Sequence, residues 1–227
     1  MTLTLISKEH LIDNVWAFRF TANGPFTWTA GQYVRVELPH ENPDGEGTKR
    51  WFTNSAAPFE EVMQITTRVT SSSFKQALAK LEPGDELQLI EPPEGDFVWQ
   101  ETELPIVFVA GGIGITPFHS ILKQRAHARQ PLNVTLIYGS RGPDVPFMDE
   151  LEAWQADHPE LQLIQAIGAP LTADKLLGMV PGLAESLVYV SGPEPMVKTL
   201  IDDLASHGVP EAQLERDEFP HYNEHNY

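Results

Sequence analysis

Residues 105–122, which read PIVFVAGGIGITPFHSIL, constrain the fold more than any other stretch of the chain. Ile106–Ala110 is a short apolar run rich in β-branched residues, which is typical of a strand buried on both faces of a parallel sheet. Three glycines follow this run. Thr116 and Pro117 come next, and they are typical of a helix N-cap and a first helical position. The stretch therefore predicts a buried strand, a glycine turn and a helix N-terminus in direct succession.

The glycine turn indicates a phosphate site. Unpaired N–H groups and the positive end of the helix dipole point outward from such a turn, and glycine lets a ligand approach the backbone closely. The pattern is not the G-x-G-x-x-G dinucleotide fingerprint, because Pro117 stands where its last glycine would be. A tight strand–helix turn that binds nothing explains the same residues, so the rest of the chain has to decide. The three glycines are Gly111, Gly112 and Gly114.

The second half of the chain continues this alternation of strands and helices. The rhythm predicts a parallel sheet with helices on both faces, and ligands of such sheets bind beyond the C-terminal ends of the strands. Strands are expected at 105–110, 132–138, 161–167, 186–191 and 213–216, and helices at 117–129, 147–157, 172–178 and 194–206.

Residues 1 to about 100 have a different pattern, of short and partly alternating segments separated by Gly, Pro, Asn and Asp. This pattern predicts a small antiparallel barrel or sandwich. One helix is expected in SSSFKQALAKL, started by a serine cap and ended by Pro-Gly. We therefore expect two domains, 1–101 and 102–227. The strand segments of the first are 14–22, 31–39, 50–56, 62–70 and 85–93.

Composition excludes several classes of function. The formal net charge of −17 argues against binding nucleic acid or an anionic membrane through the surface as a whole. The chain has no cysteine, which removes disulfides, thiolate metal sites and cysteine nucleophiles and fits a cytoplasmic enzyme. No signal peptide or membrane helix is expected. His221 and His225 have i,i+4 spacing but no third ligand, so we expect no metal site.

Five stretches occur in an order that resembles the ferredoxin–NADP reductase-like family of flavoenzymes. They are GQYVRVELP, RWFTNSAAP, ITTRVTSSSFKQAL, VFVAGGIGITPFHSIL and VYVSGPEPMVKTL. The resemblance runs from Gly31 to the C-terminus. It implies an antiparallel β-barrel that binds FAD, followed by an α/β parallel-sheet domain that binds NADH or NADPH. The chemistry that it implies is hydride transfer from the nicotinamide C4 to the flavin N5.

The resemblance also implies which residues contact the flavin. Arg50, Phe52 and Thr53 match the family motif Arg-x-aromatic-Ser/Thr, in which the Arg meets the pyrophosphate, the aromatic packs on the flavin and the hydroxyl lies near N5. Phe52 replaces the usual Tyr, so a phenolic hydrogen bond is lost. Ser72 and Ser73 fall where the family has a helix N-terminus that closes on the flavin phosphates. The implied flavin set is completed by Trp51 and Thr67.

A second set of residues is implied for the nicotinamide dinucleotide. The glycine turn would receive its pyrophosphate, together with Thr116. Ser191, Gly192 and Pro193 match the family's Cys-Gly-Pro motif beside the nicotinamide, with Ser191 in place of the cysteine. Thr53 and Ser191 are therefore the implied catalytic residues.

Two further regions are implied to contact the cofactors. Ser140 and Arg141 fall where relatives contact the adenosine ribose. The stretch IGAP at 167–170 carries no cation, which favours NADH over NADPH. Phe219 and Tyr222 in the C-terminal segment are the candidates for an aromatic residue that covers the flavin.

The sequence leaves three functions open. The first is an NAD(P)H oxidoreductase with an unidentified electron acceptor, either a small protein or a small molecule. The second is a free-flavin reductase. The third is a binding or assembly subunit that has kept the fold and lost turnover.

Overall fold

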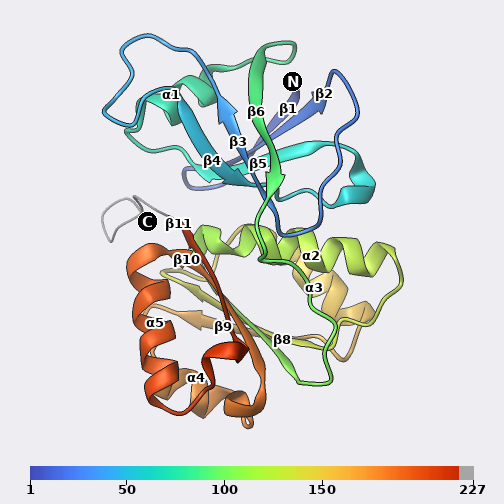
Figure 1. Cartoon of the computed structure of the whole chain (residues 1–227), viewed down its shortest axis with the longest axis vertical. Coiled ribbons are helices and arrows are strands. Elements are labelled where there is room, and N and C mark those ends of the chain that lie inside the picture. The colour runs from blue at the N-terminus through green and yellow to red at the C-terminus, as the bar shows by residue number, and fades with distance from the viewer. Residues whose placement is uncertain (220–227) are drawn as a thin grey trace. The chain divides into compact units, whose positions relative to one another are not determined.

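The computed structural model describes residues 1–219, and they form two compact units (Figure 1). The first unit contains Met1–Trp99 together with His119–Gln124, and the second contains Gln100–Phe118 and the chain from Arg125 onward. No helix in the described part of the chain is long and apolar enough to cross a membrane.

The first unit is built on a six-stranded antiparallel sheet in the order β4-β3-β6-β1-β2-β5. β4 and β5 stand at its two edges, and an isolated antiparallel bridge between Asn54 and Ile65 joins them, which curls the sheet towards a barrel. The strands are β1 (Thr2–Ile12), β2 (Val15–Ala22), β3 (Tyr33–Glu37), β4 (Lys49–Thr53), β5 (Met63–Arg68) and β6 (Glu86–Glu94).

One α-helix, α1 (Ser73–Lys80), and one 3-10 turn, η1 (Pro58–Glu60), complete the main elements of this unit. Alternating strand residues such as Phe18, Phe20, Val34 and Val36 are fully buried in its core, and Phe74 joins them from α1. The period of two along the strands places these side chains on one face. The core therefore fixes both β4 and the N-terminus of α1.

The second unit is a five-stranded parallel sheet in the order β11-β10-β7-β8-β9. α4 and α5 cover one face of the sheet and α2 covers the other (Figure 1). On that second face Phe118 of α2 stacks on Phe108 of β7. The strands are β7 (Ile106–Gly111), β8 (Val134–Ser140), β9 (Gln162–Ile167), β10 (Leu187–Pro193) and β11 (Leu214–Phe219). The α-helices are α2 (Ile115–His127), α3 (Met148–Asp157), α4 (Ala173–Met179) and α5 (Glu194–Ser206).

The expected fold class is confirmed: an antiparallel barrel-like sheet is followed by a parallel α/β sheet. Each expected strand and helix has a counterpart in the structure. The sequence analysis missed β1. A register shift between Leu5 and Ser7 leaves Ile6 46% exposed, and this breaks the apolar alternation that marks a strand.

Candidate functional site

Arg50 lies in β4 and is held by the loop that precedes it. Its Nη2 donates to Asp44 Oδ1 at 2.9 Å, and its Nε lies 3.0 Å from Glu46 Oε2. Nη1 donates to the backbone carbonyls of Glu46, Gly47 and Lys49. The Arg50 side chain is only 11% exposed. The guanidinium therefore forms a fixed, half-enclosed anion site that carboxylates of the same chain contact.

The same Asp44 carboxylate also contacts the start of α1. Its Oδ2 accepts from the Ser73 N–H at 2.9 Å, and the Ser72 hydroxyl lies 3.4 Å away. The Ser73 hydroxyl accepts in turn from the Asp44 N–H at 2.9 Å. Ser72 occupies the N-cap position but makes no side-chain capping bond. The expected serine cap is therefore wrong, and Asp44 satisfies the helix N-terminus instead.

These contacts keep Asp44 ionised. Burial by itself would raise the pKa of Asp44, but hydrogen bonds from Ser73, Glu46 and Arg50 outweigh it and lower the pKa to about 2. Two oxygens of one carboxylate thus join an arginine to a helix N-terminus. This donor set is the kind that holds a phosphate, because it combines a guanidinium fork with a backbone N–H at a positive helix end.

The side chains that follow Arg50 point to alternate faces of β4. Phe52 lies 5.7 Å from Phe74 between ring centroids, on the side of the core and of α1. Trp51 is 40% exposed and stacks edge-on with Tyr33, with the Arg35 guanidinium 5.1 Å from its ring centroid. Arg50 and Phe52 therefore share one face of the strand. Two further candidates of this unit are buried, Thr53 and Thr67.

The glycine turn of the second unit follows β7 as expected. Gly112–Gly114 forms a 3-10 turn, and Gly112 has a φ of 48°, which favours glycine. A Cβ on Gly114 would lie 2.2 Å from the Ser191 carbonyl oxygen and 2.7 Å from the Gly192 Cα. Gly114 is therefore required because the glycine turn packs directly on the backbone at the C-terminal end of β10. That packing explains this glycine without reference to a ligand.

Thr116 does not cap α2. The helix begins at Ile115, so Thr116 lies within its first turn and Pro117 follows it there. The Thr116 side chain is buried, and its hydroxyl donates to the Ile113 carbonyl at 3.1 Å. The expected N-cap is wrong because the 3-10 turn leads straight into the helix. Its assignment to the dinucleotide remains a proposal.

Ser191 lies at the C-terminal end of β10, beside a residue that the sequence analysis missed. Its buried hydroxyl donates to Asp217 Oδ2 of β11 at 3.1 Å. Burial raises the pKa of Asp217 to about 7, the Ser191 hydrogen bond opposes this rise, and the neighbouring Glu218 adds to it. The parallel register pairs Ser191 with Asp217, so this contact follows directly from the fold. The Asp217 carboxyl therefore titrates near neutral pH, well above the ordinary range of an aspartate.

Other candidates gather at the same edge of the parallel sheet. Ser140 ends β8, and its hydroxyl donates to the Gly142 carbonyl at 2.6 Å, while its own carbonyl accepts from the Gly168 N–H of the IGAP stretch. Arg141 follows on the exposed side. Phe219 ends β11 opposite Pro193. Tyr222, His221 and His225 lie outside the described residues.

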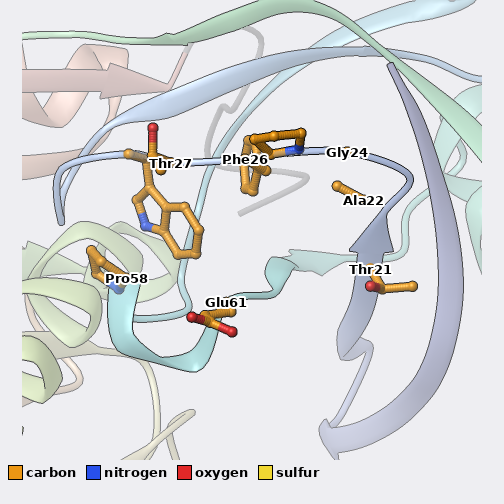
Figure 2. Close-up of a pocket in the computed structure, with 9 residues that line it drawn as sticks. Thr21, Ala22, Gly24, Phe26, Thr27, Pro58 and Glu61 are labelled. Atoms are coloured by element: carbon orange, nitrogen blue, oxygen red, sulfur yellow. The ribbon is translucent and has the colours of Figure 1, made fainter.

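Figure 2 shows a pocket in the first unit that contains none of the sequence-derived candidates. Its volume is about 470 Å³, and it lies between the segment from Thr21 to Trp28 and the residues Pro58 and Glu61. Phe26 and Trp28 meet there with ring centroids 4.9 Å apart. The pocket is therefore distinct in its residues from the Arg50 site.

Comparison with known proteins agrees with this geometry. The family model of the oxidoreductase NAD-binding domain matches residues 108–201. The chain is thus similar to flavoenzymes of the ferredoxin–NADP reductase-like family. It is 28% identical to the toluate 1,2-dioxygenase electron transfer component of Pseudomonas putida, over 83% of this chain and 58% of that protein. It is 30% identical to a Pseudomonas putida flavohemoprotein, over 81% of this chain and 49% of that protein.

Solved structures share the fold across nearly the whole chain. The flavohem-like FAD/NAD-binding domain of nitric oxide dioxygenase from Vibrio cholerae aligns with a TM-score of 0.83 at 20% identity, covering 96% of this chain and 98% of that one. A ferredoxin NADP+ reductase from Neisseria gonorrhoeae aligns with a TM-score of 0.78 at 19% identity, with the same coverage. The chain spans about half the length of the curated relatives that it matches.

Proposed function

We propose that the chain is an FAD-dependent NAD(P)H oxidoreductase that passes electrons to an acceptor. The observation that carries this proposal is the coexistence of two anion-receiving arrangements, one in each unit. Arg50 and the N-terminus of α1 form the first. We assign the second to the glycine turn that follows β7, because this turn leads directly into the N-terminus of α2. The flavin, when bound, would supply the chemistry by accepting a hydride from the nicotinamide.

The protein's own residues would then bind and orient. Arg50 and the Ser73 N–H hold a phosphate of the flavin, and Phe52 packs beside it on the same face of β4. Thr53 offers a hydroxyl at the end of the strand. In the second unit the turn at Gly111–Gly114 receives the dinucleotide pyrophosphate, and Ser191 lies beside the nicotinamide. Phe219, opposite Pro193, is the described candidate for stacking on the flavin.

Ser140 and Arg141 are proposed to contact the adenosine ribose. Gly168 of the uncharged IGAP stretch is hydrogen-bonded to Ser140, so the two segments lie side by side. In these two segments Arg141 is the cation. We expect NADH to give the higher kcat/KM, by less than about tenfold, because one exposed ion pair contributes about 1 kcal/mol or less. A strong NADPH preference that disappears in Arg141→Ala would contradict this assignment.

The acceptor is a redox protein or a small molecule. One relative is named as the electron transfer component of a dioxygenase, which makes an oxygenase component the first protein to try. A free-flavin reductase is the second candidate, and one observation favours it: Arg50 is already contacted by Asp44 and Glu46, which lowers the affinity expected for a resident flavin.

A visible spectrum with added FAD tests the proposal. The protein is mixed with FAD, passed through a desalting column, and titrated anaerobically with NADH. A bound flavin band that NADH bleaches supports the oxidoreductase. A bleached flavin that the column removes supports the free-flavin reductase. A bound flavin that neither NADH nor NADPH bleaches indicates a binding subunit, and no flavin binding or reduction under any condition contradicts the proposal.

A further inference from the structure

We propose that Asp44 is an internal competitor for the flavin phosphate, so that flavin binding requires the Asp44 carboxylate to leave Arg50 and the start of α1. This inference rests on the proposed function, because it assigns the Arg50 site to the flavin. It adds a residue that sets the affinity of that site, and a segment that has to move when the site is filled.

The contacts of Asp44 are those that a phosphate would make. One carboxylate oxygen accepts from the Arg50 guanidinium at 2.9 Å and the other from the Ser73 N–H at 2.9 Å. A phosphate offers oxygens with the same charge and a similar spacing to the same donors. The Ser73 N–H and the Arg50 Nη2 can therefore donate to Asp44 or to a phosphate, but not to both at once.

The other two nitrogens of Arg50 also have partners, in the loop and at the start of β4. Nε pairs with Glu46, and Nη1 donates to three backbone carbonyls of Glu46, Gly47 and Lys49. The side chain is 11% exposed. A flavin phosphate consequently has to displace these contacts before it can bind the Arg50 guanidinium.

The loop is built so that such an exchange is feasible. Residues 38–48 connect β3 to β4, which is longer than the roughly 2–5 residues usual in a β-hairpin. Residues 41–46 are all exposed, and Gly47 has a φ of 72°. Among the described contacts, the loop reaches α1 through Asp44 and through His40, whose Nε2 lies 3.0 Å from the Ser73 hydroxyl. Loss of the Asp44 carboxylate contacts leaves the loop joined to the helix through His40, which contacts Ser73 and Phe74, and through the Asp44 N–H.

The effect on affinity follows from population arithmetic. When only the open fraction of the protein binds a ligand, the apparent Kd is the intrinsic Kd divided by that fraction. Removing the carboxylate charge raises the open fraction. A charge-assisted hydrogen bond of this kind corresponds to about a ten- to hundredfold change in an equilibrium constant.

The test compares Asp44→Asn and Asp44→Ala with Glu41→Gln. Glu41 is an exposed acid on the same loop, so Glu41→Gln makes the same change in net charge as Asp44→Asn. The Kd of FAD and of riboflavin is measured by fluorescence titration, and the melting temperature of the flavin-free protein by circular dichroism. Riboflavin carries no phosphate, so its Kd reports any effect on the binding of the isoalloxazine ring.

We expect both Asp44 variants to tighten FAD binding by about ten- to a hundredfold, with riboflavin unchanged and the flavin-free melting temperature lowered. Glu41→Gln should match the original protein in all three. Weaker FAD binding in the Asp44 variants would mean that Asp44 positions Arg50 for the flavin, and would overturn the inference. Unchanged FAD binding, or an equal gain for riboflavin, would overturn it as well.

Failure of the proposed function gives a different pattern. If FAD and riboflavin bind to none of the variants, the Arg50 site is not a flavin site, and the inference falls with the assignment. If FAD binds to the original protein and only the Asp44 prediction fails, the flavin assignment stands and the competition does not.

Discussion

The two candidate sites of this chain are built from different chemical groups. In the antiparallel unit the site consists of charged side chains, with Arg50 and the Ser73 N–H satisfied by Asp44 and Glu46. In the parallel unit it consists of backbone, with the turn at Gly112–Gly114 packed against Ser191 and Gly192 at the end of β10. The first site depends on ionic contacts that exchange, whereas the second depends on a shape that tolerates no added atom.

This difference indicates how each site should respond to change. Substitutions in the charged site alter the competition between ligand and loop, and the core beneath it, including Phe74 and Phe18, stays intact. Substitutions in the glycine turn collide with the backbone and should affect folding as well as binding. Mutations in the charged site should therefore change ligand affinity, and mutations in the glycine turn should lower stability as well.

The largest expected effect belongs to Gly114→Ala. The added Cβ would lie 2.2 Å from the Ser191 carbonyl oxygen, so the glycine turn and the end of β10 have to move apart. We expect a loss of about 3 kcal/mol or more in the free energy of unfolding, at the upper end for overpacked sites. Denaturant unfolding measures it.

The matched control is Gly178→Ala in α4, where a Cβ meets no atom within 4 Å. This substitution should leave stability unchanged or raise it by up to about 1 kcal/mol, as usual for glycine in a helix. Equal stability of Gly114→Ala and Gly178→Ala would show that the glycine turn and the end of β10 are not packed as described.

Arg50→Ala should have the next largest effect, on FAD affinity. Loss of a charge-assisted contact to a phosphate corresponds to about 1.5–3 kcal/mol, or roughly ten- to a hundredfold in Kd. Lys49→Ala removes the same charge from the adjacent, exposed position of β4 and is the control. Fluorescence titration with FAD compares them. Unchanged FAD affinity in Arg50→Ala would remove Arg50 from the site.

The sequence predicted elements better than it predicted contacts. The helix expected at 194–206 begins and ends at those residues, because Val197, Leu200, Ile201 and Leu204 recur at helical spacing and are all buried. The cap on α1 was not predictable, since Asp44 is 29 residues from Ser73 and the contact depends on how the loop folds back. The local sequence pattern predicts a serine cap, but in the folded chain Asp44 makes the capping contact.

Asp217 was missed for a related reason. The last strand was expected at 213–216, and the strand extends to Phe219. Only this extension brings Asp217 into register with Ser191. The apolar pattern ends before the strand does, because Arg216, Asp217 and Glu218 are charged. Pairing with β10 stabilises the strand where the side chains give no signal.

The smallest stability effect is a pH dependence caused by Asp217. Its pKa is raised from 3.8 to about 7 in the folded protein, so its contribution to stability is complete below about pH 4 and is lost as the pH rises to about 7. Asp217→Asn should remove this pH-dependent loss of stability, because an amide does not titrate in this range.

The measurement is unfolding by denaturant at pH 4.5 and 7.5, with Asp202→Asn as the control. Asp202 is an exposed carboxylate on α5. The control should keep the pH dependence of the original protein. If Asp217→Asn and Asp202→Asn give the same pH dependence, Asp217 is ionised in the folded state across this range.

Anaerobic stopped-flow mixing with NADH tests most directly the claim that the charged site binds the flavin and the backbone site serves the nicotinamide. The FAD-loaded protein and Arg50→Ala, supplied with enough FAD to saturate it, are each mixed with NADH while the flavin absorbance near 450 nm is followed. We predict that NADH bleaches both at similar rates, because Arg50 acts in holding the flavin and not in hydride transfer. A saturated original protein whose flavin stays oxidised in NADH and in NADPH would contradict the account.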